Sequence, residues 1–196
     1  INIGTLNQHT IPAMISAGKR ANALGHPVVL DPVGAGASPL RTRSAFRLME
    51  EIQFTAVRGN ISEIKTLALG SGTTKGVDAD LADAVTEDTI DGIVKFAEDF
   101  AKRTGAVIAI TGATDIVAGA DKAYLIRNGH PIMGRITGSG CMLSAMLCAY
   151  LVANPENALE ATAAAICAMG LCGEKAFARM GKEDGNATFR NYLIDA

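Results

Sequence analysis

Apolar runs alternate with amphipathic stretches along the first half of the chain, which is the pattern of alternating strands and helices. Residues 27–31, 54–58 and 106–112 are rich in apolar side chains and short, as parallel strands buried on both faces are. Residues 41–53 and 87–103 lie between and beside them and repeat apolar positions at helical spacing. This order predicts helices packed against a mainly parallel sheet.

The pattern changes after residue 112. Three short segments there have the composition of strands, at residues 115–118, 123–126 and 131–133. The last two are separated by Asn128-Gly129, a dipeptide typical of hairpin turns. Two predicted helices of mostly small residues follow, over residues 141–153 and 158–180. The sequence therefore predicts an α/β layered fold with a mainly parallel sheet and antiparallel edge strands.

The stretch Thr137-Gly138-Ser139-Gly140-Cys141 is the feature around which we interpret the rest of the chain. Glycines at positions 138 and 140 allow the main chain to turn sharply and to approach a ligand closely. The following helix, which we expect to begin at Cys141, directs free N–H groups and its positive dipole end at the turn. A phosphate or an oxyanion fits such a position. An ordinary strand-to-helix turn is the simpler alternative, because short glycine motifs are weak signals.

Polar side chains gather where the predicted parallel strands end. They are Asp31, Arg58, Asn60, Glu63 and Thr111. Ligands of open α/β sheets bind at the carboxyl ends of the strands, so we expect these residues and the turn to share one cleft. Two carboxylates suit Mg²⁺, a guanidinium suits phosphate, and main-chain amides suit the loose transition state of phosphoryl transfer. The combination predicts phosphoryl transfer from ATP.

Each of these residues also has a simpler interpretation. Asp31 and Glu63 could cap a helix or a turn, and Arg58 could form a surface ion pair. Cys141 could be a small buried apolar side chain. The three histidines lie near predicted loops, and we expect none of them to be catalytic.

Composition narrows the class of partner. The chain has 18 basic and 20 acidic residues without a block of like charge, which excludes the electrostatic footprint of a nucleic-acid-binding protein. We expect a small-molecule ligand. The four cysteines lie in apolar helical sequence without metal-ligand spacing, which predicts a reduced, cytoplasmic protein. The longest apolar region, residues 158–171, contains Glu160 and is too short to cross a bilayer, so we expect no membrane association.

Residues 70–84 are polar and irregular, and we interpret them as a mobile loop or lid. They do not form a phosphate-binding P-loop, because Lys75 lacks a glycine before it and a hydroxyl after it. The length of the chain fits one domain over residues 1–196. Residues 1–5 have the composition of the end of a strand, so we expect truncation at the N-terminus. Residues 189–194 open like a helix and stop, so we also consider truncation at the C-terminus.

Four motifs occur in order along the chain. They are Asp31-Pro32-Val33-Gly34-Ala35-Gly36, Arg58-Gly59-Asn60 with Glu63, Ala109-Ile110-Thr111-Gly112, and the turn from Thr137 to Cys141. Together they closely resemble the hydroxyethylthiazole kinases of the ribokinase-like superfamily, over nearly the whole chain. Cysteine at position 141, where most of the superfamily has aspartate in a G-x-G-D turn, makes the match specific.

The resemblance implies a ribokinase-like layered fold with helices on both faces of the sheet. It implies ATP-dependent phosphorylation of the hydroxyl of 4-methyl-5-(2-hydroxyethyl)thiazole in thiamine salvage. It also implies Mg²⁺ and a homotrimer with active sites between the subunits. The family has an additional N-terminal segment, with a methionine against the thiazole, so we expect part of the substrate pocket to be absent from this chain.

Individual roles follow from the same resemblance. Asn60 and Glu63 match the N-x-x-E metal and phosphate signature of the superfamily, and Asp31 matches a second acid on the magnesium side. Arg58 and Thr111 match positions that contact the nucleotide. We therefore expect Asp31 and Glu63 at the metal, and Arg58, Asn60 and Thr111 at ATP.

The resemblance also implies roles for residues of the turn from Thr137 to Cys141. Gly138 matches a residue that lines the thiazole alcohol site, and Cys141 matches the position facing the attacking hydroxyl. Ser139, Gly140 and Cys141 form the expected catalytic segment. Early proton removal gains little in a loose phosphoryl transfer, so we expect Cys141 to help the reaction without being indispensable.

Other functions are also considered. Pyrimidine and pyridoxal kinases of the same superfamily are the nearest alternative, although they have aspartate where Cys141 stands. Cys141 could instead be the nucleophile of a hydrolase or transferase, which would need a histidine near its sulfur. A dinucleotide-binding domain is disfavoured, because no strand precedes a G-x-G-x-x-G motif. A nucleotide-binding module without catalytic activity is a further alternative.

Overall fold

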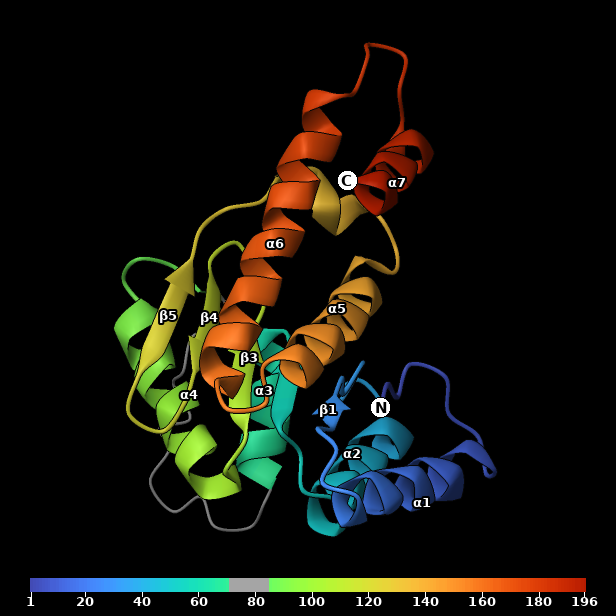
Figure 1. Cartoon of the computed structure of the whole chain (residues 1–196), viewed down its shortest axis with the longest axis vertical. Helices are drawn as coiled ribbons and strands as arrows, with labels where there is room; N and C mark the ends of the chain where they lie inside the picture. Colours follow the sequence, from blue (N-terminus) through green and yellow to red (C-terminus); the bar gives the residue numbers. More distant parts are fainter. Residues whose placement is uncertain (71–84) are drawn as a thin grey trace.

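A five-stranded sheet forms the centre of the computed structural model, which describes residues 1–70 and 85–196 (Figure 1). The strands are hydrogen-bonded in sequence order: β1 (Val29–Leu30), β2 (Ala56–Gly59), β3 (Val107–Ile110), β4 (Asp115–Ala118) and β5 (Ala123–Ile126). β1, β2 and β3 are parallel, whereas β4 and β5 pair antiparallel. This arrangement confirms the predicted fold class. The predicted lid lies outside the described residues, except for Gly70.

One face of the sheet is covered by the N-terminal helices. They are α1 (Thr10–Ala23), α2 (Pro39–Glu51), α3 (Ile61–Gly70) and α4 (Ile90–Thr104). Their apolar side chains join Leu30, Val57 and Ile108 of the strands in one buried cluster. The beginning of α2 shows how the sequence specifies an element: the Ser38 hydroxyl accepts from the Arg41 N–H, and Pro39 occupies the first helical position.

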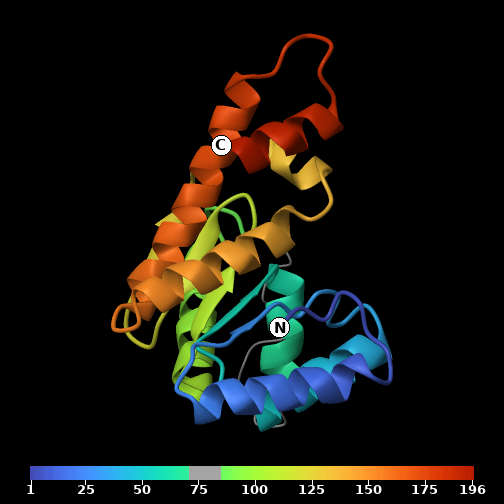
Figure 2. The same cartoon turned by 45° about the vertical axis from the view of Figure 1, so that its right-hand side comes forward.

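The opposite face is covered by the C-terminal helices α5 (Ser139–Ala153), α6 (Ala158–Ala178) and α7 (Asn186–Asp195). Their side chains pack with Val29, Ala56 and Ala109 in a second buried cluster. α6 runs along the sheet and extends beyond it, where α7 lies beside it (Figures 1 and 2). The sheet therefore has helices on both faces, as expected for a ribokinase-like fold.

The apolar region 158–171 was predicted to be too short to cross a bilayer, but α6 extends to Ala178 and by length and composition could cross a membrane. Half of its apolar window is buried inside the structure, where it packs against β3, β4 and β5. Small residues allow this close packing: a Cβ atom added at Gly170 would lie 2.6 Å from the Asn128 side chain. One at Gly173 would overlap the Met133 sulfur. α6 is therefore a core helix of this fold.

Two local predictions are wrong. Residues 131–133 form part of a 3-10 helix, η1 (Pro131–Arg135), and not a strand, because Asn128 and Gly129 bond to α6 instead of closing a hairpin. The helix of the turn begins at Ser139, so Cys141 is its third residue and not its first. Gly138 explains the earlier start, since its φ of 100° lets the chain turn directly into the helix.

Candidate active site

The strand periodicity directs three polar side chains toward α5. Side chains alternate between the two faces of a sheet, and Val29, Ala56 and Ala109 belong to the cluster beneath α5 and α6. Asp31, Arg58 and Thr111 each lie two residues later along the chain. All three therefore reach the carboxyl edge of the sheet on the face that α5 covers.

Arg58 is the centre of these contacts. Its Nη2 donates to the Thr111 hydroxyl over 2.8 Å, and its Nη1 lies 3.6 Å from Oδ2 of Asp31. The guanidinium also lies against the turn, since a Cβ atom added at Gly140 would be 2.7 Å from Nη1. Its side chain is 13% exposed, so this positive charge is held by the fold at the start of α5.

Asp31 connects β1 to α5. It is 1% exposed, and its Oδ2 accepts from the Ser144 hydroxyl at 2.8 Å and from the Asn2 amide at 2.9 Å. The same Asn2 nitrogen lies 3.2 Å from the Cys141 sulfur. Asp31, Arg58 and Cys141 are therefore brought together, as the sequence predicted.

The turn has the geometry of an anion site. Gly138 is the N-cap of α5, and nothing lies within 4 Å of a Cβ atom placed on it, so the backbone there is open to a ligand. The next three residues, Ser139, Gly140 and Cys141, form the first turn of the helix, whose N–H groups have no partner within it. The Ser139 hydroxyl donates to the Met133 carbonyl at 3.3 Å, which joins the turn to η1.

Asn60 and Glu63 lie at the same edge but belong to the other helical layer. They form a capping box at the start of α3: the Glu63 N–H donates to Oδ1 of Asn60, and the Asn60 N–H donates to Oε2 of Glu63. Oε1 of Glu63 accepts from the Gly34 N–H at 2.8 Å, in the loop that follows Asp31. Both residues thus have a structural role as helix caps. Their position at the carboxyl edge of the sheet would also allow them to contact a ligand there.

The carboxylates at this edge fit a magnesium ion that is shared with phosphates. Within residues 1–70 and 85–196, no group of three or more His, Cys, Asp or Glu side chains could hold a metal alone. Mg²⁺ usually requires only one or two protein carboxylates, with water and substrate phosphate as its other ligands. Oδ1 of Asp31 is buried without a hydrogen-bond partner, and each Glu63 oxygen accepts one N–H and retains a lone pair.

A cavity of about 520 Å³ opens beside the turn, within the size range of small-molecule sites. Arg58, Thr111 and Gly140 line one part of it, and Ile166 and Met169 of α6 line another. A charged end and an apolar end suit a nucleotide, whose phosphates would meet the guanidinium and whose base would meet α6.

Asp115 also lines this cavity, and the sequence reasoning did not single it out. It accepts from the Gly112 N–H at 2.8 Å. Burial raises the pKa of its carboxyl group, although that hydrogen bond and the nearby Arg58 act in the opposite direction. The available signal in the sequence was that Asp115 lies only three residues after Gly112, where the strand-end motif ends.

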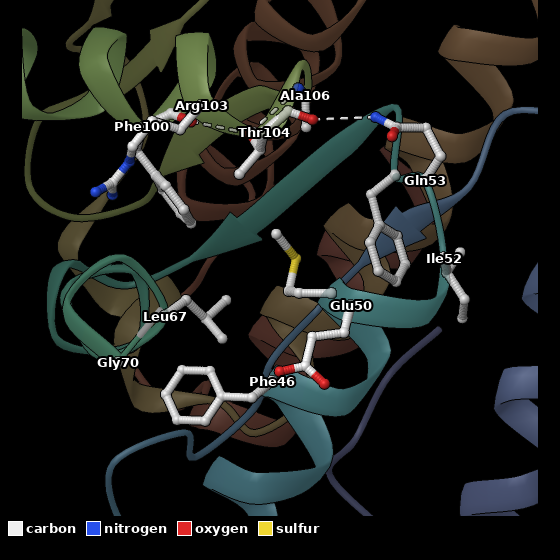
Figure 3. A pocket seen from close by; sticks show the side chains of 12 residues that line it. Phe46, Glu50, Ile52, Gln53, Leu67, Gly70, Phe100, Arg103, Thr104 and Ala106 are labelled. Carbon is white, nitrogen blue, oxygen red and sulfur yellow. Dashed lines mark hydrogen bonds between the residues drawn. The ribbon is translucent and has the colours of Figure 1, made fainter. Parts of the chain in front are cut away.

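A second cavity, of about 600 Å³, lies at the other edge of the sheet between α2, α3 and α4 (Figure 3). Phe54 and Ala106, which precede β2 and β3, line it together with Phe46 and Phe100. It contains none of the residues expected at the active site. Ligands of open α/β sheets bind at the carboxyl ends of strands, so the cavity beside the turn is the better candidate.

The described histidines do not pair with Cys141. His130 lines the cavity beside the turn, but its Nδ1 accepts from the Ile132 N–H and its ring stacks on Phe177 at 3.5 Å. His9 contacts Gln8. The hydrogen bond described for the Cys141 sulfur is to Asn2, so the geometry gives no support to a cysteine nucleophile with a histidine base.

Sequence reasoning also missed Asn2 and Ser144, which both bond to Asp31. For Asn2 the sequence shows only that it alternates with the apolar Ile3, and the parallel bridge that brings it beside Asp31 is seen only in the structure. For Ser144 a signal was present in the sequence. Ser144 follows Cys141 by three residues and so lies on the same side of the helix.

The model of the hydroxyethylthiazole kinase family matches residues 1–196. The hydroxyethylthiazole kinase of Clostridium acetobutylicum is 63% identical over 195 residues, which covers 100% of this chain and 71% of that protein. The hydroxyethylthiazole kinase of Desulfovibrio desulfuricans is 45% identical over 204 residues, which covers 100% of this chain and 72% of that protein.

Solved structures give a consistent result. The hydroxyethylthiazole kinase protein from Pyrococcus horikoshii OT3 superposes with a TM-score of 0.82 at 31% identity, covering 100% of this chain and 70% of that one. An ADP complex of Bacillus subtilis pyridoxal kinase superposes with a TM-score of 0.57 at 20% identity, covering 92% and 64%. The second similarity shows a shared fold alone.

Proposed function

The chain belongs to the hydroxyethylthiazole kinase family, and we propose that its cleft at the start of α5 transfers the γ-phosphoryl group of ATP to the hydroxyl of 4-methyl-5-(2-hydroxyethyl)thiazole. It is a phosphotransferase with an alcohol as acceptor, and its role is thiamine salvage. The observation that supports this site is the convergence of Arg58, Asp31 and Cys141 on the open turn at Gly138.

In the proposed reaction, a bond forms between the alcohol oxygen and the γ-phosphorus while the bond from phosphorus to the bridging β,γ oxygen breaks. ADP leaves, and the hydroxyl proton passes from the alcohol oxygen to water. The N–H groups of Ser139, Gly140 and Cys141 would bind the oxygens of the transferring group, and Arg58 would balance their charge. Gly138 would let the alcohol approach this point, with Cys141 facing its hydroxyl.

Magnesium and ATP complete the proposal. Arg58, Thr111 and Asn60 would contact the nucleotide, and Asp31 and Glu63 would hold Mg²⁺, directly or through water. When bound, the ion would neutralise phosphate charge. The unpartnered Oδ1 of Asp31 and the position of Glu63 beside the Gly34 loop support this assignment.

Two further properties belong to the same proposal. We expect one ribokinase-like domain that assembles as a homotrimer with active sites between subunits. We also expect a cytoplasmic location, which the four free cysteines support. Light scattering during size-exclusion chromatography measures the assembly, and a monomeric mass would contradict it.

A coupled assay for ADP release tests the function. We expect ADP to form with ATP, Mg²⁺ and the thiazole alcohol together, and only at background level when the alcohol is omitted. Pyridoxal and hydroxymethylpyrimidine serve as competing acceptors. Faster turnover of either would favour a related kinase, and ATP binding without ADP release would indicate a binding module.

A further inference from the structure

The side chain of Asn2 makes three hydrogen bonds at the centre of the candidate site. Its Oδ1 accepts from the Gly4 N–H at 2.8 Å. Its Nδ2 donates to Oδ2 of Asp31 at 2.9 Å and lies 3.2 Å from the Cys141 sulfur. Asn2 thereby links β1 to α5 at the point where the proposed transfer takes place.

These contacts fix the orientation of the amide. An asparagine amide can usually be placed in two ways, since its oxygen and nitrogen are similar in size. Here the Gly4 N–H can only donate and the Asp31 carboxylate can only accept, so the oxygen must face Gly4 and the nitrogen must face Asp31. The Cys141 sulfur therefore meets an N–H group and acts as the acceptor.

We propose that Asn2 is a positioning residue for the phosphoryl transfer, which holds the Cys141 sulfur as a hydrogen-bond acceptor beside the alcohol. The inference rests on the proposed function, because it assumes that Cys141 faces the alcohol. The N–H group of Asn2 fixes the position of the Cys141 sulfur relative to β1. Asp31 in turn keeps the Asn2 amide in place.

A variant of Ser144 distinguishes the positioning of Cys141 by Asn2 from the support that Asn2 gives to Asp31. Its hydroxyl also donates to Oδ2 of Asp31, at 2.8 Å, and its other described contact is the Gly140 carbonyl. Ser144→Ala therefore removes a donor to Asp31 without removing the donor to Cys141. Asn2→Leu removes both donors, and the similar size of leucine limits any change in access to the sulfur.

Alkylation of Cys141 by iodoacetamide without substrates tests the local effect. Cys167 is exposed on α6 and serves as an internal reference, with both sites quantified by peptide mass spectrometry. We expect Asn2→Leu to change the ratio of Cys141 to Cys167 alkylation about fivefold, as for the loss of one hydrogen bond that holds the sulfur. Ser144→Ala should leave the ratio unchanged.

Kinetics then test the link to catalysis. We expect Asn2→Leu to lower kcat with an unchanged KM for ATP, and to have a smaller effect in the Cys141→Ala background. The matched control is Asn154→Leu, at the far end of α5, where the described hydrogen bond of the exposed amide is to the Tyr150 carbonyl; it should retain wild-type rates. Asn2→Ser replaces Asn2→Leu if thermal unfolding shows that the leucine variant does not fold.

The results separate this inference from the proposed function. An unchanged ratio of Cys141 to Cys167 alkylation in Asn2→Leu would overturn the positioning role, as would equal losses of kcat in both Cys141 backgrounds. Absence of phosphorylation by the wild-type protein would instead refute the proposed function, and the alkylation ratio would still report on Asn2.

Discussion

At the scale of single residues, the site depends on how closely Arg58 approaches Gly140. The Nη1 atom occupies the space where a side chain at position 140 would begin. This contact places a positive charge next to the N–H groups of the α5 first turn, and both features stabilise the same phosphoryl oxygens. Position 140 therefore requires a glycine, because any larger side chain would collide with the Arg58 guanidinium.

Gly140→Val is expected to reduce kcat/KM by at least about 10²-fold, comparable to the loss of one preorganised donor to a transition state. The added side chain would displace Arg58 and block the approach of the phosphate to the main chain. Steady-state kinetics measure the effect. Gly92→Val is the control, because nothing lies within 4 Å of a Cβ atom there; a near-normal rate for Gly140→Val would refute the anion-site role of the turn.

Cys141→Ala should lower the single-turnover rate by less than the roughly 10²-fold typical of a lost general base. The physical reason is that positioning by the turn dominates a loose phosphoryl transfer. Rapid-quench measurements, with ATP affinity determined in parallel, provide the comparison. Complete loss of transfer with intact ATP binding would show that the thiol is indispensable.

Asp115 leads to a pH-dependent prediction. Burial raises the pKa of Asp115 in the folded state above the ordinary value of 3.8. Between the pKa of the unfolded state and the higher pKa of the folded state, the folded protein therefore binds more protons than the unfolded protein. Stability therefore falls as the pH rises through this window. Asp115→Asn should have a higher Tm than the wild type at pH 7, because the amide oxygen still accepts from Gly112 and the half-buried charge is removed.

The Tm advantage of Asp115→Asn should shrink as the pH falls through the raised pKa of Asp115, because the wild-type carboxyl then becomes protonated. Thermal unfolding followed by circular dichroism at several pH values measures it. A Tm difference that stays constant, or that grows in acid, would contradict the effect of burial.

At the scale of elements, α3 is held at the site by its own cap. Asn60 and Glu63 satisfy each other's N–H groups, and Glu63 also accepts from Gly34 in the loop after β1. The start of α3 and the loop that carries Asp31 are thus connected by one side chain. A change in this cap should affect both stability and the site.

Asn60→Ala is expected to lower the free energy of unfolding by about 1 kcal/mol, as for the loss of an N-cap side chain. Chemical denaturation measures this change, and Asn154→Ala, which alters the exposed C-cap of α5, is the matched control. If Asn60 also contacts ATP as proposed, its variant should show a higher KM for ATP. Unchanged stability together with unchanged KM would leave the residue with neither role.

Elements with a strong local signal could be predicted from the sequence. The apolar runs gave β1, β2 and β3, and the Ser38-Pro39 pair marks the start of α2. η1 was predicted as a strand because Asn128-Gly129 is a hairpin signal in isolation. In the fold Asn128 donates to the Cys167 carbonyl and Gly129 to Glu174, so tertiary contacts with α6 overrode the local preference.

At the scale of the whole molecule, part of the site follows from topology alone. Parallel strands end at one edge, so Asp31, Arg58 and Thr111 could be placed together from the sequence. Asn2 could not be placed beside Cys141 in this way, since 139 residues separate them and the contact depends on how α5 docks on β1. Contacts between layers require the packed structure, whereas contacts along one sheet edge follow from the strand order.

The most direct test of the central claim is a crystal structure with a non-hydrolysable ATP analogue, Mg²⁺ and the thiazole alcohol. We predict that the γ-phosphate lies within hydrogen-bond distance of the main-chain N–H groups at Ser139, Gly140 and Cys141, with the alcohol oxygen in line beside the sulfur. A γ-phosphate bound elsewhere, for example in the cavity lined by Phe46 and Phe100, would contradict the account.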